Sequence, residues 1–487
     1  MDISSLLSAK CKLKTQTDID DAIATFTNTL KIAAMRATPK SAPLESSRTS
    51  PDGLRIASPS NFLPSHIKKL VALKRKARSL WQTIHSPDSR RKFNQASNNL
   101  KQALYKLRND AFTNYITNLR RDDHSIWRPI RSNKKPTTPN PPIRKNSTPP
   151  GNWAIRDKEK ADLFASYLAD VFSPHDRGTD PDIEQDLGQP VHPPNPPPVF
   201  TSRQLTQVIR KLKTRKAPGA DLVTTQMLKE LPQEGLTYLR HIYNAITRTS
   251  YWPQAFKHAQ IIMIPKPGKD PKDISSYRPI SLLPTISKVL EKLLISHITN
   301  DADLQPWIPH HQFGFRKAHS TIQQCHRITD AIHKAFDDQR YCSAVFLDIS
   351  QAFDKVWHPG LLYKIKHLLP LRYFQILRSY LYGRTYNTKF NSATSSPHPI
   401  QSGVPQGSIL GPLLYTLYTS DLPLSKHTIT STFADDTAIV ALDSDPTSVS
   451  GFLQEHLYRI ALWLHKWRIQ VNRSKSTHIT FTTRNGR

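Results

Sequence analysis

The chain has few cysteines, and those it has are not arranged to bind a metal. Its 487 residues include only three, Cys11, Cys325 and Cys342, which form no C-x-x-C pair and follow no zinc-ligand spacing. This usage is typical of a reducing compartment and indicates no zinc knuckle within these residues.

Long apolar runs are also absent from the sequence. No stretch approaches the eighteen or so consecutive apolar residues of a membrane span. The start, Met1–Ser5, has no basic segment followed by an apolar one, so we expect no secretion and no membrane partner. We therefore expect an intracellular protein, whose oligomeric state the sequence does not reveal.

Acidic residues are few in comparison with basic ones. Lys and Arg number 68 against 38 Asp and Glu, which gives a net charge of +30 and a pI near 10.0. A balance this basic says little about fold but favours a polyanionic partner such as nucleic acid. The length is sufficient for two to four domains with substantial cores.

Two adjacent carboxylates, Asp435 and Asp436, lie between two β-rich runs. We expect a hairpin with both at its tip, because only a turn can aim neighbouring strand side chains near one point. Adjacent carboxylates repel each other unless a cation lies between them, and Mg²⁺ is held by carboxylates together with substrate phosphates. Taken alone, the pair is explained better by an ordinary surface turn.

A third carboxylate, Asp348, ends the apolar run Val345–Leu347, which is typical of a buried strand. It is either the N-cap of the turn that follows or a member of the same site. Between the two sites lies a loop, residues 401–412, that contains Gly403 and Gly407 and opens a helical pattern of leucines. Such a loop lets backbone N–H groups approach a phosphate or a base closely.

The order of these features is the strong signal. A strand ending in Asp348, then Phe353-Asp354, the glycine loop, the Asp435-Asp436 hairpin and Asn472-Arg473-Ser474-Lys475 follow one another. In this order they resemble the palm of reverse transcriptases, most closely those of jockey-clade non-LTR (LINE-type) retrotransposons. The resemblance runs from about Pro64 to the last residue. It implies an α+β right-hand polymerase with fingers and an antiparallel palm sheet with helices, preceded by a basic helical extension.

The resemblance also assigns chemistry to the carboxylates. Asp348 and Asp435 would hold two Mg²⁺ ions, for which Mn²⁺ can substitute, with Asp436 as a weaker, partly structural partner. Lys475 matches the lysine proposed to protonate the leaving pyrophosphate, with a solvated surface lysine as its alternative. The implied reaction is RNA-directed DNA synthesis, with an RNA template (the element's own transcript), a DNA primer or target DNA, and dNTPs as partners.

Four further residues are assigned by resemblance to the incoming nucleotide. Phe353 looks like the steric gate that excludes a 2′-hydroxyl, although a core phenylalanine explains it equally well. Gln406 resembles the residue that lies against nucleotide and template. Lys266 and Arg278, near the tip of an expected finger hairpin, would clamp the triphosphate; lysines of an ordinary exposed hairpin are the alternative.

Template and primer contacts are assigned to Arg316, Gly403 and Gly407, and a helix cap is the alternative role for Arg316. His319 in the same stretch has no second ligand at metal-binding spacing. Further upstream, the family commonly has a glycine after the aspartate that ends the fingers entry. Here Leu222 follows Asp221, a small departure from the pattern.

We divide the chain into five segments, the first three from composition and periodicity and the last two, fingers and palm, from the resemblance. These are an N-terminal helix with a Pro/Ser-rich linker (1–60), the basic helical extension (61–132), a Pro-rich connector with one helix (133–200), the fingers (201–340) and the palm (341–487). The extension carries sixteen Lys and Arg against four Asp from Pro64 to Arg131. This excess favours RNA binding over a hairpin with merely solvated lysines.

The family's endonuclease, primer grip and thumb have no counterpart in these residues. We therefore expect the 487 residues alone to bind RNA but to extend primers poorly or not at all. An RNA-templated RNA polymerase is the rival enzyme, and Phe353 argues against it. A catalytically silent RNA-binding remnant of a decayed element is the alternative from another class, against which the intact carboxylate set argues.

Overall fold

The chain folds as two units that each pack on their own in the computed structural model. One comprises Met1–Thr38 with Pro142–Arg487, and the other Pro39–Pro141. The structure describes residues 13–38, 64–119, 141–145, 153–175, 178, 180–190, 196–301 and 308–483. The expected linker at 39–59, and parts of the proline-rich connector, lie outside the described residues. None of the described helices has the length and apolar character to cross a membrane.

The smaller unit is a helical hairpin of α3 (Ser65–Ile84) and α4 (Pro87–Thr117). Ser86 begins α4 by accepting a hydrogen bond from the Ser89 N–H, and Trp81 stacks on Phe93 across the two helices at 5.7 Å. The predicted helices are confirmed. Helical spacing predicts that Leu80 and Ile84 lie on the apolar side of α3, but both are exposed, because two helices share only one contact face.

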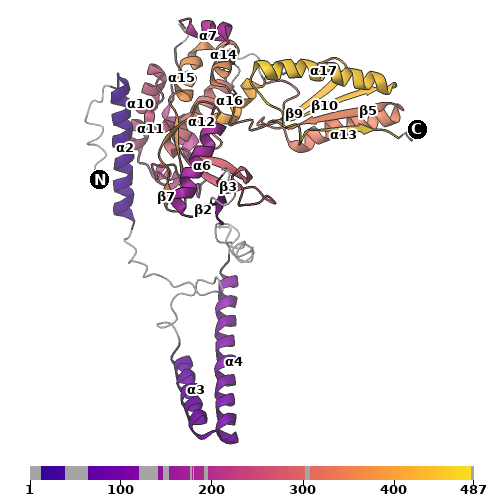
Figure 1. Cartoon of the computed structure of the whole chain (residues 1–487). Helices are drawn as coiled ribbons and strands as arrows, with labels where there is room; N and C mark the ends of the chain where they lie inside the picture. Colours follow the sequence, from indigo (N-terminus) through magenta and orange to yellow (C-terminus); the bar gives the residue numbers. More distant parts are fainter. Residues whose placement is uncertain are drawn as a thin grey trace. The chain divides into compact units, whose positions relative to one another are not determined.

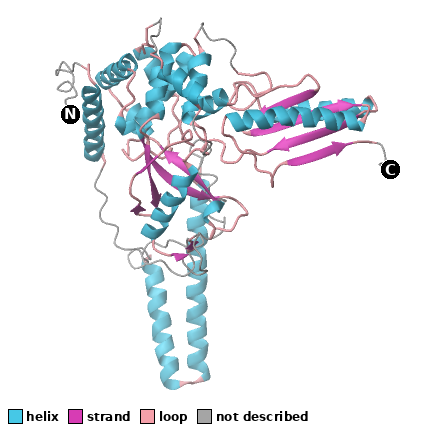
Figure 2. Ribbon diagram, turned by 45° about the horizontal axis from the view of Figure 1, so that its top comes forward, coloured by secondary structure: helices cyan, strands magenta, loops and turns pink. Residues whose placement is uncertain are grey.

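The palm sheet of the larger unit has four antiparallel strands in the order β11-β5-β10-β9 (Figures 1 and 2). Their bounds are β5 Tyr341–Leu347, β9 Thr428–Phe433, β10 Asp436–Asp443 and β11 Thr477–Phe481. The apolar pattern of Ile469–Val471 also predicts a strand there, and this prediction is wrong, because Val471 makes only an isolated bridge to Ile349.

Both faces of the palm sheet are covered by helices, and alternating side chains of its strands pack against them. Val345 and Ile439 pack with residues of α17 (Pro446–Lys466), whereas Ala344 and Val440 pack with Ala335 of α13 (Thr321–Asp337). The two helices contact opposite faces (Figure 1). This packing fixes the register of β5 against β10, on which the candidate site depends.

The second sheet has the order β4-β3-β6-β7, with β8 also paired to β6. The expected hairpin of β3 (His258–Pro265) and β4 (Tyr277–Leu282), with a short 3₁₀ turn η2 (Ile274–Ser276) before β4, is confirmed. The sequence did not predict β6 (Thr385–Phe390), which runs parallel to β3, or β7 (Ala393–Thr394) and β8 (His398–Pro399).

The predicted division at residue 340 does not follow the packing. The expected finger segment ends in α13, which packs on the palm sheet, and the expected palm segment contains β6, which joins the finger hairpin. The two parts therefore interleave along the chain. Strand pairing over such distances leaves no local periodicity in the sequence, so the pattern of residues could not indicate it.

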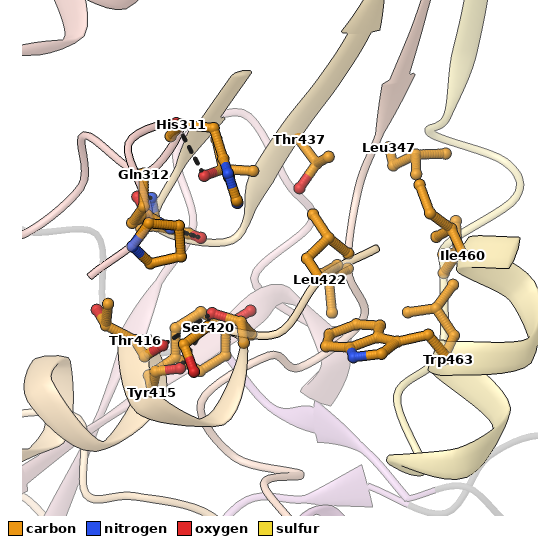
Figure 3. A pocket seen from close by; sticks show the side chains of 17 residues that line it. His311, Gln312, Leu347, Tyr415, Thr416, Ser420, Leu422, Thr437, Ile460 and Trp463 are labelled. Atoms are coloured by element: carbon orange, nitrogen blue, oxygen red, sulfur yellow. Dashed lines mark hydrogen bonds between the residues drawn. The ribbon is translucent and has the colours of Figure 1, made fainter. Parts of the chain in front are cut away.

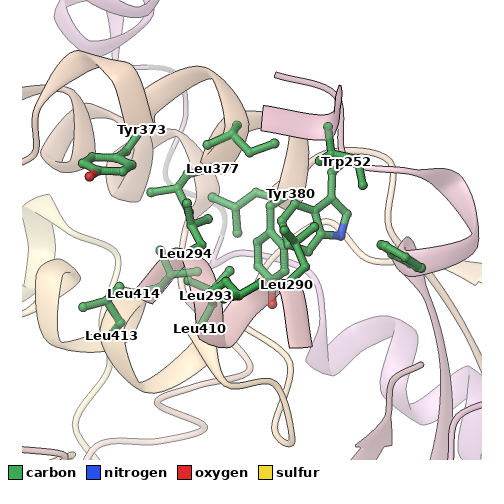
Figure 4. Packing of buried hydrophobic residues seen from close by; sticks show 14 of the residues in the cluster. Trp252, Leu290, Leu293, Leu294, Tyr373, Leu377, Tyr380, Leu410, Leu413 and Leu414 are labelled. Atoms are coloured by element: carbon green, nitrogen blue, oxygen red, sulfur yellow. The ribbon is translucent and has the colours of Figure 1, made fainter. Parts of the chain in front are cut away.

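A helical core lies beside the second sheet. Trp252 and leucines and tyrosines of three helices interdigitate there (Figure 4). The three are α12 (Thr285–Thr299), α15 (Leu371–Leu381) and α16 (Leu410–Tyr418). The remaining helices of this part are α8 (Ser202–Arg210), α9 (Thr225–Lys229), α10 (Gln233–Thr249), α11 (Gln254–Lys257) and α14 (His358–Leu368). The N-terminal helix α2 (Gln16–Ala37) also packs here, with Phe26 against Tyr238 of α10.

The proline-rich connector contains more structure than predicted. Besides the expected helix α6 (Asp157–Val171), it forms α7 (Pro181–Gly188) and the short pair β1 (Ile143–Arg144) and β2 (Trp153–Ala154). Its prediction of a single helix is therefore wrong. Asp180 caps α7 and Pro181 begins it, a local signal that the density of prolines concealed.

The departure at Leu222 has a conformational cost. Leu222 adopts φ +59° with its side chain largely exposed. A left-handed backbone is disfavoured for a residue with a Cβ atom. A glycine at this position, as the family commonly has, meets no such penalty.

Candidate active site

The three acidic residues singled out in the sequence meet at one end of the palm sheet. β9 and β10 form the expected hairpin, with Phe433 paired to Asp436 and Ala434-Asp435 as its two-residue turn. The register pairs Thr437 of β10 with Leu347 of β5. One further step along the same register sets Asp348, which directly follows β5, opposite Asp436.

The charges of these carboxylates influence one another. The pKa of Asp436 is raised by partial burial first, and then by the negative charges of Asp435 and Asp348. Asp348 forms an ion pair with Lys475, with 3.2 Å between Oδ2 and Nζ. The segment that carries this lysine is fixed beside Asp348: the Asn472 N–H donates to the Asp348 carbonyl at 2.7 Å, and the Asp348 N–H to Ser476 Oγ at 3.2 Å.

The donor set has the chemistry that a hard divalent cation requires. Carboxylate oxygens are the ligands Mg²⁺ prefers, and a cation would relieve the mutual repulsion of the three charges. In the conformation described, no three His, Cys, Asp or Glu side chains among the described residues are arranged to hold a metal ion. The positive charge beside Asp348 is supplied here by Lys475.

A groove of about 370 Å³ opens beside the carboxylates. It is lined by Asp348, Asp436 and Lys475 from the palm and by residues of α13 such as Cys325. A smaller enclosed cavity of about 20 Å³ lies next to the hairpin, among Gln312, Tyr415 and Trp463 (Figure 3). The groove is the space open to a ligand next to the acidic residues.

Phe353 lies half-buried in a stack of aromatic rings. Its ring is parallel to that of Tyr415 at 4.6 Å and meets that of Phe315 edge-on at 5.8 Å. It also packs against the main hydrophobic core. This environment agrees with the core explanation without testing the gate, which stays a prediction.

Gln406 is held by a buried carboxylate. Its Nε2 donates to both oxygens of Asp354 at 2.9 Å, and Asp354 is only 6% exposed. Burial raises the pKa of Asp354 to about 7, although the bond from Gln406 and the nearby Lys355 and Lys266 act in the opposite direction. These two bonds orient the Gln406 amide with its nitrogen toward Asp354 and its oxygen away from it.

The two loop glycines are required by packing within the protein. A Cβ atom on Gly403, which has φ +90°, would lie 2.5 Å from the Asp354 carbonyl oxygen. One on Gly407, which has φ +127°, would lie 2.5 Å from that of Ser281. The Ser281 N–H in turn donates to the Gln406 carbonyl at 2.8 Å. Contact of either glycine with template or primer stays a prediction.

Sequence analysis missed the residue that anchors this loop to α12. Glu291 is fully buried, and its Oε2 accepts from the N–H groups of Ile409 and Leu410 at 2.6 and 3.1 Å, where α16 begins. Burial raises the pKa of Glu291 against these bonds. The only available signal was a glutamate among the apolar positions of an amphipathic helix, which by itself indicates no partner.

The basic residues of the finger hairpin lie near the same site. The Lys266 ammonium donates to the Ser275 carbonyl at 2.7 Å. Its pKa is lowered by partial burial first, and then by the positive charges of Lys475, Arg278 and Lys269. Lys266 therefore lies close enough to Arg278 and to Lys475 for both positive charges to lower its pKa.

Arg316 lies half-buried in the turns before α13. The cap of that helix is Ser320, which forms a capping box with Gln323, so the helix-cap alternative for Arg316 is wrong. Its predicted contact with template remains untested. His319 stacks edge-on against Phe313 at 4.6 Å.

Part of the chain matches a known protein family. Residues 264–485 match the family described as reverse transcriptase (RNA-dependent DNA polymerase). A probable RNA-directed DNA polymerase from transposon X-element of Drosophila melanogaster is 37% identical over 99% of this chain and 52% of its own length. The RNA-directed DNA polymerase from mobile element jockey of the same species is 34% identical over 96% of this chain and 51% of its own length. The chain thus spans about half the length of these curated relatives.

Among solved structures, a telomerase from Candida albicans in complex with a fragment of telomeric RNA is similar with a TM-score of 0.34. The two are 12% identical, and the match covers 46% of this chain and 43% of the telomerase chain. The mixed fold of helices and antiparallel sheets fits the fingers and palm of a polymerase.

Proposed function

Because residues 264–485 belong to the reverse transcriptase family, we propose that this chain catalyses RNA-directed DNA synthesis for a jockey-type non-LTR mobile element. One observation carries the proposal. Within the matched region, folding sets Asp348 opposite Asp436 next to the turn that holds Asp435. Polymerase chemistry requires such a meeting of carboxylates beside a groove.

The family generally uses divalent metal ions, and we propose two Mg²⁺ ions here, for which Mn²⁺ can substitute. Asp348, Asp435 and Asp436 would hold them. When bound, the ions supply activation of the primer 3′-hydroxyl and neutralise charge on the leaving pyrophosphate. The fit rests on the oxygen donor set and on the raised pKa of Asp436.

The protein groups around the carboxylates have distinct roles in this proposal. Lys475, paired with Asp348 in the absence of substrate, donates a proton to the leaving pyrophosphate once a nucleotide attracts its ammonium away. Lys266 and Arg278 hold the triphosphate through their positive charges.

The nucleotide itself would be selected by Phe353 and Gln406. The Phe353 ring, supported from below by Tyr415, lies under the sugar and excludes a 2′-hydroxyl. Gln406 presents an amide whose orientation Asp354 fixes. Arg316 and the backbone at Gly403 and Gly407 would follow template and primer.

We further propose an element transcript as RNA template, target DNA as primer, and dNTPs as substrates. The net charge of +30 supports such polyanionic partners, and the helical hairpin α3–α4 is the proposed RNA-binding extension. With these partners, we propose that the protein acts as part of a ribonucleoprotein in the nucleus and cytoplasm.

Primer extension on a primed RNA template with Mg²⁺ tests the proposal. The chain is first completed with the thumb of a jockey-type relative, because the 487 residues alone are expected to extend primers poorly. Asp348→Asn and Asp435→Asn should each abolish extension while RNA binding changes little, whereas the matched control Asp330→Asn, an exposed carboxylate on α13, should leave extension intact. Extension that survives in either site variant would refute the assignment. RNA binding without extension by the thumb-completed chain that carries no substitution would favour the silent RNA-binding remnant.

A further inference from the structure

A short segment before α13 lies along the edge strand of the palm sheet. Gln312 forms a parallel bridge with Thr432 of β9. The Phe313 N–H donates to the Thr432 carbonyl at 3.0 Å, and the Thr432 N–H donates to the His311 carbonyl at 2.9 Å. The segment thereby extends the sheet beside the hairpin that carries Asp435.

The Gln312 side chain reaches past this bridge to the hairpin turn. Its Oε1 accepts from the Ala434 N–H at 3.0 Å and from the Gly314 N–H at 2.7 Å, and its Nε2 donates to the Ala434 carbonyl at 3.3 Å. Both backbone polar groups of Ala434 are thus bound by one amide. Gln312 is only 4% exposed, so these bonds are sheltered from water (Figure 3).

Ala434 needs such support because of its backbone. It adopts φ +58°, the left-handed region that residues with a Cβ atom rarely enter. It is the first residue of the two-residue turn, and Asp435 is the second. A change of conformation at Ala434 would therefore move the Asp435 carboxylate.

The close approach is possible only with a glycine at position 314. A Cβ atom there would lie 2.1 Å from the Ala434 nitrogen and 2.9 Å from Gln312 Oε1. Gly314 thus lets the backbone of the segment lie against the turn, and the Gln312 amide binds the turn there.

Simple attachment of the segment does not explain Gln312. A second buried glutamine, Gln324 of α13, already joins the segment to β9, because its Nε2 donates to the His311 and Thr432 carbonyls at 2.8 and 2.9 Å. The Gln312 side chain bonds to neither of these carbonyls: it binds Ala434 of the turn and the Gly314 N–H of its own segment.

We infer that Gln312 is a positioning residue for the active site: its amide holds Ala434 in the left-handed conformation and thereby fixes the carboxylate of Asp435. The consequence for catalysis rests on the proposed function, whereas the clamp itself is a property of the fold. Gln312 touches no reacting atom and acts only through the turn.

Gln312→Met tests this inference, because methionine keeps the length of the side chain and removes the amide. Hydrogen exchange of the Ala434 amide should accelerate at least roughly tenfold, since its acceptor is lost, while amides within β10 stay protected. Binding of Mn²⁺, followed by electron paramagnetic resonance without turnover, should weaken. In extension assays the maximal rate should fall by up to ~10²-fold, as expected for a displaced carboxylate, with dNTP affinity less affected.

A second substitution separates positioning from general damage. Ala434→Gly relieves the left-handed strain, so in the Gln312→Met background it should restore the rate by roughly fivefold. Gln323→Ala is the matched control, because it removes another glutamine amide of the same region, one that caps α13 instead. It should leave exchange at Ala434 and Mn²⁺ binding unchanged.

Unchanged exchange at Ala434 and unchanged Mn²⁺ binding in Gln312→Met would overturn the inference. So would a loss of rate that Ala434→Gly fails to relieve. If the thumb-completed chain without substitutions extends no primer at all, the proposed function fails, but exchange and Mn²⁺ binding still decide whether the clamp exists.

Discussion

Asp354→Asn should change how the stability of the chain depends on pH. Asp354 is buried, and its pKa is raised from 3.8 to about 7, chiefly by loss of solvent. The folded state therefore binds a proton that the unfolded chain releases at lower pH. The stabilising contribution is complete below pH 3.8 and is lost as the pH rises through 7. Asparagine has nearly the same shape but does not ionise, so its contribution is independent of pH.

The magnitude follows from the shift. At roughly 1.4 kcal/mol per unit of pKa, the rise from 3.8 to about 7 corresponds to ~4 kcal/mol, an upper limit for a site that can relax. Relative to the unmodified protein, Asp354→Asn should gain free energy of unfolding between about pH 4 and pH 7 and then level off. The constant offset from replacing one oxygen by an amide nitrogen does not affect this slope.

Urea unfolding of both proteins at constant ionic strength, from pH 4 to pH 8, measures the difference. Asp330→Asn, which removes an exposed carboxylate on α13, controls for the loss of one negative charge. A difference between Asp354→Asn and the unmodified protein that stays constant across this range would refute the reasoning. The same result would mean that Asp354 binds Gln406 as an ordinary ionised carboxylate.

Three further outcomes are expected. Leu222→Gly should raise the free energy of unfolding by ~0.5–1 kcal/mol, measured by urea unfolding, because it relieves φ +59° at an exposed position; a decrease would show that the side chain packs. Phe353→Ala should allow ribonucleotide incorporation with much less discrimination, measured as relative efficiencies for the two sugars, and unchanged selectivity would leave Phe353 as a core residue. Replacing Lys74, Arg75 and Lys76 of α3 by Gln should weaken RNA binding and make the slope of log K against log salt shallower by up to ~2, from roughly 0.7 per lost phosphate contact; weaker binding at an unaltered slope would mean that the hairpin acts by packing.

Features decided by local chemistry could be predicted from the sequence. The strand before Asp348, the hairpin around Asp435, the helix after the glycine loop and the basic helical hairpin all appear where their patterns indicate. Each of these features depends on the alternation of side chains, helical spacing or turn residues within a few positions, so the local sequence is enough to indicate it.

The failures of prediction share a different origin. β6 joins β3 across more than a hundred residues, and α13 packs on the palm sheet although it precedes the predicted palm, so the contiguous division into fingers and palm did not hold. Ser320 and not Arg316 caps α13, so the helix-cap alternative for Arg316 failed, since a capping hydroxyl three residues before Gln323 is the better local solution. α7 was hidden because proline both breaks helices and begins them.

The sequence by itself determined which residue types this protein brings to the candidate site and in what order: three aspartates, a phenylalanine, a glutamine and several lysines on recognisable local elements. Only the tertiary structure decided what orients them. Gln312 lies 122 positions from Ala434, and Glu291 lies 118 positions from Ile409, so neither partner could be read from spacing. A buried amide or carboxylate has no stable place without its hydrogen-bond partners, and those partners come together only when the sheets and helices pack.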